Sequence, residues 1–121
     1  MSVEEQLQIV ASNGSDRLIL ALEGELDLAS ARLLANALAS VDLDGARAVV
    51  LDLGGLRFLD STGLREIFKA QKAVHEGGRG FAVTRCSPQV QRLLHITRLD
   101  EHLDSIETPE SELPEEPLDA G

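Results

Sequence analysis

The chain has 121 residues, 43% hydrophobic and 26% charged, which is the size and composition of one globular domain and excludes a disordered chain. With 11 Lys and Arg against 21 Asp and Glu, the formal net charge is −10, and the only aromatic residues are three Phe, so binding to nucleic acid is disfavoured. A single cysteine, Cys86, excludes an internal disulfide and a Cys-rich zinc site. The sequence has no apolar run of bilayer length and no signal-peptide pattern at its acidic N-terminus, so we expect a cytoplasmic protein without membrane contact.

Hydrophobic periodicity predicts a hairpin and a helix in the first third of the chain. Two paired strands are predicted at 6–11, where polar and apolar residues partly alternate, and at 17–22, where an apolar run is almost continuous. Turn residues lie between them. Residues 23–27 break this pattern. Apolar residues at helical spacing then predict a helix over 28–41.

The next strand is predicted to be central. Residues 48–53 are apolar on both faces, which is typical of a strand covered by helices, and the glycine pair at 54–55 is expected to end it. A helical stripe of apolar residues follows over 61–75, and the glycine pair at 77–78 stops that helix.

The last third predicts one more strand and one more helix. Residues 80–84 are strand-like, while Ser87 and Pro88 suit the N-cap and the first position of a helix. Residues 99–106 predict no definite element, although their apolar residues would share a helix face. The order β-β-α-β-α-β-α predicts an α/β sandwich, in which helices cover a mixed sheet of four to five strands.

Residues 107–121 differ in composition from the rest. They contain six acidic residues, no basic residue and three of the four prolines. We therefore expect a domain at 1–106 and a disordered tail at 107–121, which either aids solubility or docks a basic partner.

Few residues are candidates for catalysis. The histidines at 75, 95 and 102 lie in or near predicted helices without the spacing of metal ligands. Cys86 could be a reactive thiol near a helix start, but a small apolar filler is the simpler interpretation. We expect no catalytic residue, no metal and no cofactor.

The most informative segment is Leu59–Leu64, at the edge of the sheet where α/β proteins bind ligands and partners. Asp60, Ser61 and Thr62 are all favoured helix N-caps, which is one interpretation. The other is a phosphoacceptor. A phosphate there would add about 1.5 to 2 negative charges, the helix N–H groups would hold it, and a docked partner would have to desolvate it.

Four segments occur in the order and spacing of one known family: Gly24–Asp27, Val49–Leu53, Phe58–Leu64 and Ser87–Leu99. Together they resemble the signature of the STAS domain family of anti-sigma factor antagonists. The resemblance covers residues 6–106 and agrees with the α/β sandwich predicted above.

The resemblance implies a small cytoplasmic bacterial switch. In such proteins the unphosphorylated form binds an anti-sigma factor that is also a GHKL-type serine kinase, and this releases a sigma factor. The kinase phosphorylates the antagonist, and a PP2C-type phosphatase restores it. Carried over, the phosphoacceptor is Ser61, with Thr62 the secondary candidate. Asp27 matches an acid that is important for partner binding, and capping of the first helix is its alternative or additional role.

The expected partner-binding residues are Asp27, Asp60, Ser61, Thr62, Gly63, Leu64, Arg65 and Ile67. Gly63 would let the partner approach closely, while Leu64 and Ile67 would be apolar docking contacts, with burial in the core as their alternative. Arg65 and Glu66 follow where many antagonists continue with glycine, so partner specificity is expected to differ.

Two other functions stay open. A STAS subunit of a stress-sensing assembly or of a lipid-transport ABC complex would use the domain as a structural contact and should co-purify with paralogues or a membrane ATPase. A small hydrolase with Ser61 as nucleophile would need a base and an orienting acid, which the sequence does not place. We therefore expect a phosphorylation-gated binding module and not an enzyme.

Overall fold

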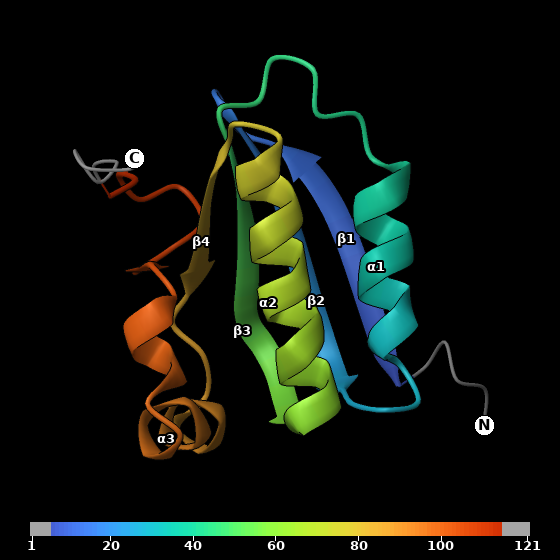
Figure 1. Ribbon diagram of the computed structural model, residues 1–121, viewed down its shortest axis with the longest axis vertical. Coiled ribbons are helices and arrows are strands. Elements are labelled where there is room, and N and C mark those ends of the chain that lie inside the picture. Colours follow the sequence, from blue (N-terminus) through green and yellow to red (C-terminus); the bar gives the residue numbers. More distant parts are fainter. Residues whose placement is uncertain (1–5, 115–121) are drawn as a thin grey trace.

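A five-stranded sheet with helices on one face forms the fold of residues 6–114, the part of the chain that this computed structural model describes (Figure 1). The elements are β1 (Leu7–Asn13), β2 (Arg17–Leu26), α1 (Ala31–Ser40), β3 (Ala48–Leu59), α2 (Ser61–Glu76), β4 (Gly80–Thr84), α3 (Pro88–Ile96), the 3-10 helix η2 (Leu99–His102) and β5 (Ser105–Ile106). Over this range, no helix has the length and apolar character needed to cross a membrane.

The sheet is mixed, as predicted. Its strand order is β1-β2-β3-β4-β5, with β1 antiparallel to β2 and every other pair parallel. The α/β sandwich expected from the sequence is confirmed. The segment 99–106, for which no definite element was predicted, forms η2 and then the short strand β5 beside β4.

The core lies between the sheet and the two helices α1 and α2. Alternate residues of the central strands face the helices and are almost fully buried: Leu18, Leu20, Leu22, Val49, Leu51 and Leu53. Helix α2 packs on these residues with an apolar stripe at helical spacing: Leu64, Ile67, Ala70 and Val74. Burial of each large side chain in such a core stabilises the fold by about 1.5–3 kcal/mol.

Two strands run past their predicted ends. β2 continues to Leu26 and β3 to Leu59, although the sequence predicted breaks after 22 and at 54–55. Their mutual pairing shifts register between Ala21 and Glu23 and again after Gly24, so the irregular residues are accommodated without ending the strands. Gly24 has a φ of 113°, and a Cβ there would overlap the Gln6 carbonyl oxygen. The extension carries both strands down to the predicted site.

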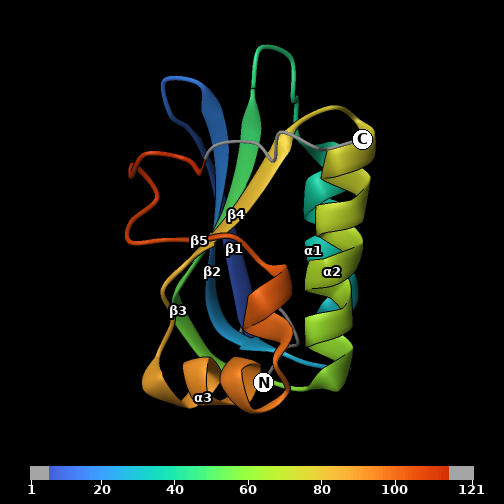
Figure 2. The ribbon, with the colours of Figure 1, turned by 60° about the vertical axis from the view of Figure 1, so that its left-hand side comes forward.

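The segment after β5 lies against the sheet face opposite the helices (Figure 2). We call residues 107–114 the C-terminal strap. Arg17 Nη1 donates hydrogen bonds to the carbonyl oxygens of Pro109 (3.0 Å) and Ser111 (2.6 Å). Leu113 packs on a second apolar cluster formed by Ile19, Val50, Ala82 and Ile106. The structure thus departs from the expected boundary at 106, because the strap is held to the domain. Residues 115–121 of the expected tail lie outside the described residues.

Candidate functional site

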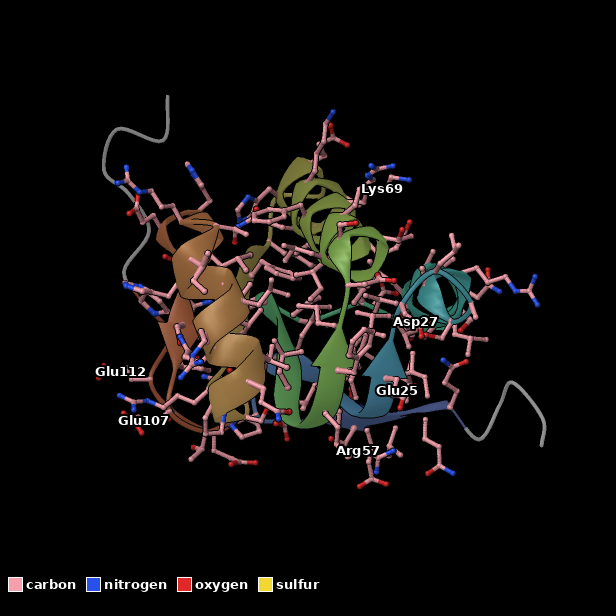
Figure 3. All side chains as sticks on the ribbon, turned by 90° about the horizontal axis from the view of Figure 1, so that it is seen from below. Glu25, Asp27, Arg57, Lys69, Glu107 and Glu112 are labelled. Carbon is pink, nitrogen blue, oxygen red and sulfur yellow. The ribbon has the colours of Figure 1, made fainter. Side chains whose placement is uncertain are left out.

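The predicted site lies where two parallel strands end side by side. Leu26 of β2 and Leu59 of β3 pair in register, so Asp27 and Asp60 follow them at the same edge of the sheet. Figure 3 views the molecule from this end and shows Asp27 between the end of β2 and the start of α1. The topology therefore brings together two acids that are far apart in the sequence.

Asp60 joins the two chain segments at this edge. Its Oδ1 accepts a hydrogen bond from the Gly63 N–H (2.8 Å), which caps α2, and its Oδ2 accepts one from the Leu28 N–H (3.1 Å). Its own N–H donates to the Leu26 carbonyl (3.3 Å). Because Asp60 is the cap, the neighbouring hydroxyl of Ser61 is not needed to begin the helix.

Asp27 shapes the loop that leads into α1. Its Oδ1 accepts from the N–H groups of Ala29 (3.0 Å) and Ser30 (3.2 Å), and its Oδ2 accepts from Gln6 Nε2 (2.6 Å). The hydroxyl of the fully buried Ser30 donates to the Glu25 carbonyl (2.7 Å). The alternative role of Asp27, capping of the first helix, is wrong, because α1 begins at Ala31 and Ser30 occupies the N-cap position.

Ser61 is the first residue of the 16-residue helix α2, and its side chain is exposed. The positive end of the helix dipole favours negative charge at this place. Arg65 is also exposed and follows four residues later, so both side chains share one face of the helix. Thr62 is partly buried, which makes it the less accessible hydroxyl.

Three of the expected contact residues lie inside the protein and cannot be docking contacts. Leu64 is 5% exposed and Ile67 is 0% exposed, because the helix face that carries them packs on the sheet. Gly63 is buried as well, and a Cβ there would overlap the Leu26 carbonyl oxygen. Glycine is therefore required for the close approach of α2 to β2 and not for the approach of a partner.

Two exposed apolar residues at this edge were not selected from the sequence. Leu28 is 77% exposed in the loop after Asp27, and Phe58 is 48% exposed near the end of β3. Phe58 pairs in register with Glu25 of β2. Leu28 was expected to begin a helix, and Phe58 was expected to lie in a motif beyond the strand. Leu28 follows Asp27 directly and Phe58 lies two residues before Asp60, so an apolar residue close to each acid was the available signal.

The described residues offer little that could support catalysis. No group of three or more His, Cys, Asp or Glu in residues 6–114 could hold a metal ion. His75 lies near the opposite end of α2 from Ser61, about 21 Å away at the rise of an α-helix. Burial raises the pKa of the half-buried Cys86 thiol above its ordinary value, and the thiol donates to Gln91 Oε1 (3.3 Å). A protonated thiol is a poor nucleophile at neutral pH.

Comparison with known proteins agrees with this architecture. Residues 6–112 match the STAS domain family. The anti-sigma-F factor antagonist RsfB of Mycobacterium tuberculosis is 27% identical over 100 residues, which cover 83% of this chain and 81% of RsfB. An anti-sigma F factor antagonist of Paenibacillus polymyxa is 32% identical over 94 residues, covering 77% of this chain and 80% of its own length. The crystal structure of an anti-sigma factor antagonist from Mycobacterium paratuberculosis matches 91% of this chain and 93% of its own, with a TM-score of 0.77 and 25% identity. The chain therefore belongs to the STAS domain family and is related within it to the anti-sigma factor antagonists.

Proposed function

We propose that this protein is an anti-sigma factor antagonist whose binding is switched off by phosphorylation of Ser61. The observation that carries the proposal is that capping and exposure fall to two different residues at the start of α2. Asp60 caps the helix, while the Ser61 hydroxyl is exposed at the first helical position. Ser61 can therefore be modified without loss of the bond that begins the helix.

The partner would dock on the switch surface, which we define as Leu28, Phe58, Ser61, Thr62 and Arg65. Leu28 and Phe58 supply exposed apolar area near the same edge of the sheet as the polar groups. Burial of such side chains in an interface is favourable by about 25 cal/mol per Å² of apolar surface. Asp27 and Asp60 act on binding by holding the two loops in place, since their carboxylates bond to backbone N–H groups of those loops.

Phosphorylation would change this surface without unfolding it. The phosphate brings about 1.5 to 2 negative charges to a place beside Asp60, and a docked partner would have to desolvate them. In the unbound protein the α2 N-terminus and Arg65 would stabilise the phosphate, because Arg65 lies one helical turn beyond Ser61. Phosphorylation would thus leave the free protein stable and lower its affinity for the partner.

The partners implied by the family resemblance are an anti-sigma factor that is a GHKL-type serine kinase and a PP2C-type phosphatase. In this scheme the protein is a cytoplasmic binding module and not an enzyme. It uses no cofactor of its own, since the kinase supplies the ATP chemistry. Arg65, which stands where many antagonists have glycine, would restrict which kinase can dock.

The test is capture of partners from a native lysate with tagged wild type, Ser61→Asp and Ser15→Asp, followed by mass spectrometry; Ser15 is an exposed turn residue outside the switch surface. We expect wild type and Ser15→Asp to retain a GHKL-type kinase and Ser61→Asp to lose it. The purified kinase with ATP should then phosphorylate wild type and Thr62→Ala but not Ser61→Ala. Equal capture of the kinase by wild type and Ser61→Asp would refute the switch. An ABC ATPase or STAS paralogues captured equally by all three proteins would instead establish a scaffold role.

A further inference from the structure

A groove runs between α1 and α2, which lie side by side on the sheet (Figure 1). It has a volume of about 500 Å³, which is within the range of natural binding pockets. Its floor is formed by buried apolar residues of both helices: Leu34, Ala70 and Val74. The rims carry Ala35 on α1 and Ala73 on α2, which are exposed and too small to close the groove.

The two helices beside this groove are the positively charged part of an acidic protein. Together they have four basic side chains against two acidic ones, a net charge of +2. The basic side chains are Arg32, Arg65, Lys69 and Lys72, and the acidic ones are Glu66 and Glu76. The rest of the chain has seven basic and 19 acidic side chains, a net charge of −12. An anionic partner is therefore attracted to the helices and repelled by the rest of the protein.

Three of these cations form a row along α2. Arg65, Lys69 and Lys72 are exposed and follow one another at intervals of four and three residues, so they share one face of the helix and span about 10 Å. Lys69 lines the groove, and Figure 3 shows it on the side of α2 that faces away from the sheet. Its ammonium lies 3.4 Å from Glu66 Oε2, which leaves two of its three N–H donors for another carboxylate. Among residues 6–114, Arg65 and Lys72 have no ion-pair partner.

We propose that the groove binds an acidic amphipathic helix of another protein. Apolar residues at positions i, i+3, i+4 and i+7 of that helix would fill the groove. Its carboxylates, three or four residues apart, would face Arg65, Lys69 and Lys72 at the matching spacing. A row of cations about 10 Å long fits carboxylates spread along a helix, whereas a fatty acid would present one carboxylate at one end. The small side chains of Ala35 and Ala73 on the rims allow the close approach of a third helix.

The chain does not supply such a helix in the part that the structure describes. α1 and α3 contain no acidic residue, so a second copy offers no acidic helix that could dock here. The acidic C-terminal strap is held on the opposite face of the sheet by Arg17. Residues 115–121 contain one leucine and a central proline, Pro117, and this sequence does not predict an amphipathic helix. The partner is therefore a different protein.

This inference does not rest on the proposed phosphorylation switch. The part of α2 that lines the groove runs from Glu66 to Val74, more than one helical turn beyond Ser61. Arg65 belongs to both surfaces and lies between them. Either proposal can fail while the other holds, because the tests below use neither a kinase nor a Ser61 variant.

Fluorescence anisotropy with two labelled peptides tests the charge of the partner. Both peptides are amphipathic helices about 15 residues long with leucine along one face. One carries glutamate beside the leucines, and the other carries lysine at the same positions. We expect the glutamate peptide to bind the full chain about tenfold more tightly than the lysine peptide. Because the net charge of −10 favours the lysine peptide at long range, this preference would have to come from the cations of α1 and α2.

Two matched pairs of variants test the place of binding. Ala35→Phe would fill the groove and should weaken binding of the glutamate peptide about tenfold, whereas Phe at Asn36, the exposed neighbour outside the groove wall, should not. Lys69→Glu should weaken binding about tenfold as well. Arg92→Glu on α3 makes the same change in net charge and should leave the affinity unchanged. Circular dichroism checks that all four variants are folded.

The contrary results are distinct. Absence of binding of the glutamate peptide, a preference for the lysine peptide, or equal effects within either pair of variants would overturn the proposal. Binding of laurate in place of the peptide would show that the groove takes a fatty acid. Tighter binding of the peptide after removal of residues 115–121 would show that the chain's own C-terminus occupies the groove, and the proposal of a different protein would be wrong.

Discussion

Replacement of Gly63 by alanine tests how α2 is joined to the sheet beside Ser61. In an isolated helix this change would stabilise by about 1 kcal/mol, because alanine loses less backbone entropy than glycine. In this structure the new Cβ would overlap the Leu26 carbonyl oxygen and lie 2.8 Å from the carbonyl carbon. Leu26 is fully buried, and its carbonyl accepts the Asp60 N–H, so it cannot retreat without loss of other contacts.

The magnitude follows from three effects. Overpacking of a rigid site costs about 1–3 kcal/mol. A shift of the start of α2 would also weaken the Asp60 cap, which contributes about 1 kcal/mol. After subtraction of the alanine gain of about 1 kcal/mol, we expect Gly63→Ala to lose about 2 kcal/mol of stability. For a domain of this size that loss lowers the melting temperature by roughly 8 °C.

Urea unfolding followed by circular dichroism measures the effect. The matched control is Gly80→Ala, where the new Cβ would lie 3.5 Å from Ala48 Cβ, an ordinary contact, so we expect a change within about 0.5 kcal/mol. The unfolding slope should stay constant, since the surface exposed on unfolding does not change. A Gly63→Ala protein as stable as wild type would refute the contact with Leu26 as the reason for glycine. An equal loss in Gly80→Ala would show that the effect is not specific to the start of α2.

Three further substitutions or reagents test other parts of the structure. Asp60→Ala should lose about 1–2 kcal/mol in urea unfolding, because the cap of Gly63 and the bond to the Leu28 loop are both removed. Leu113→Ala should lose roughly 1 kcal/mol, because the strap leucine packs on the second apolar cluster, whereas Ala at the exposed Glu112 should have no measurable effect. Iodoacetamide should alkylate native Cys86 more slowly than the unfolded chain at pH 8, because burial raises the pKa of its thiol. The unfolded thiol releases its proton at lower pH than the native one, so this group favours the folded state less as pH rises above the unfolded pKa.

Each of these has a clear contrary result. An Asp60→Ala protein with wild-type stability would mean that the cap contributes nothing. Equal stability of the Leu113→Ala and Glu112→Ala proteins would mean that the strap does not pack on the sheet in solution. Alkylation of native and unfolded Cys86 at one rate would contradict the burial of the thiol.

The secondary structure was predictable where its cause is local. The buried strand at 48–53 and the helix at 61–75 follow from apolar periodicity, which any chain segment carries in its own sequence. The ends of β2 and β3 were not predictable in this way. Gly54 and Gly55 look like a strand end, but pairing with β2 continues past them with shifted register, and that pairing comes from a distant segment.

The candidate site, like the strands, was predictable from the sequence only in part. A serine beside an acid at a helix start is visible in the sequence, and the family resemblance singled out Ser61. Which residue caps the helix was not visible, since Asp60, Ser61 and Thr62 are all good caps. The structure assigns the cap to Asp60. Leu64 and Ile67 were misassigned as contacts because a docking stripe and a core stripe have the same spacing on a helix.

The α/β class, the family and the position of Ser61 at a helix start could be predicted from the chain alone, because they depend on local patterning and on short motifs in order. Three features required the folded protein: Asp27 and Asp60 lie at one edge, Leu28 and Phe58 stay exposed there, and Leu113 of the strap packs on the second apolar cluster. These features differ from the first group because exposure and hydrogen-bond partners depend on which distant segments pack together. Nothing in the spacing of neighbouring residues carries that information.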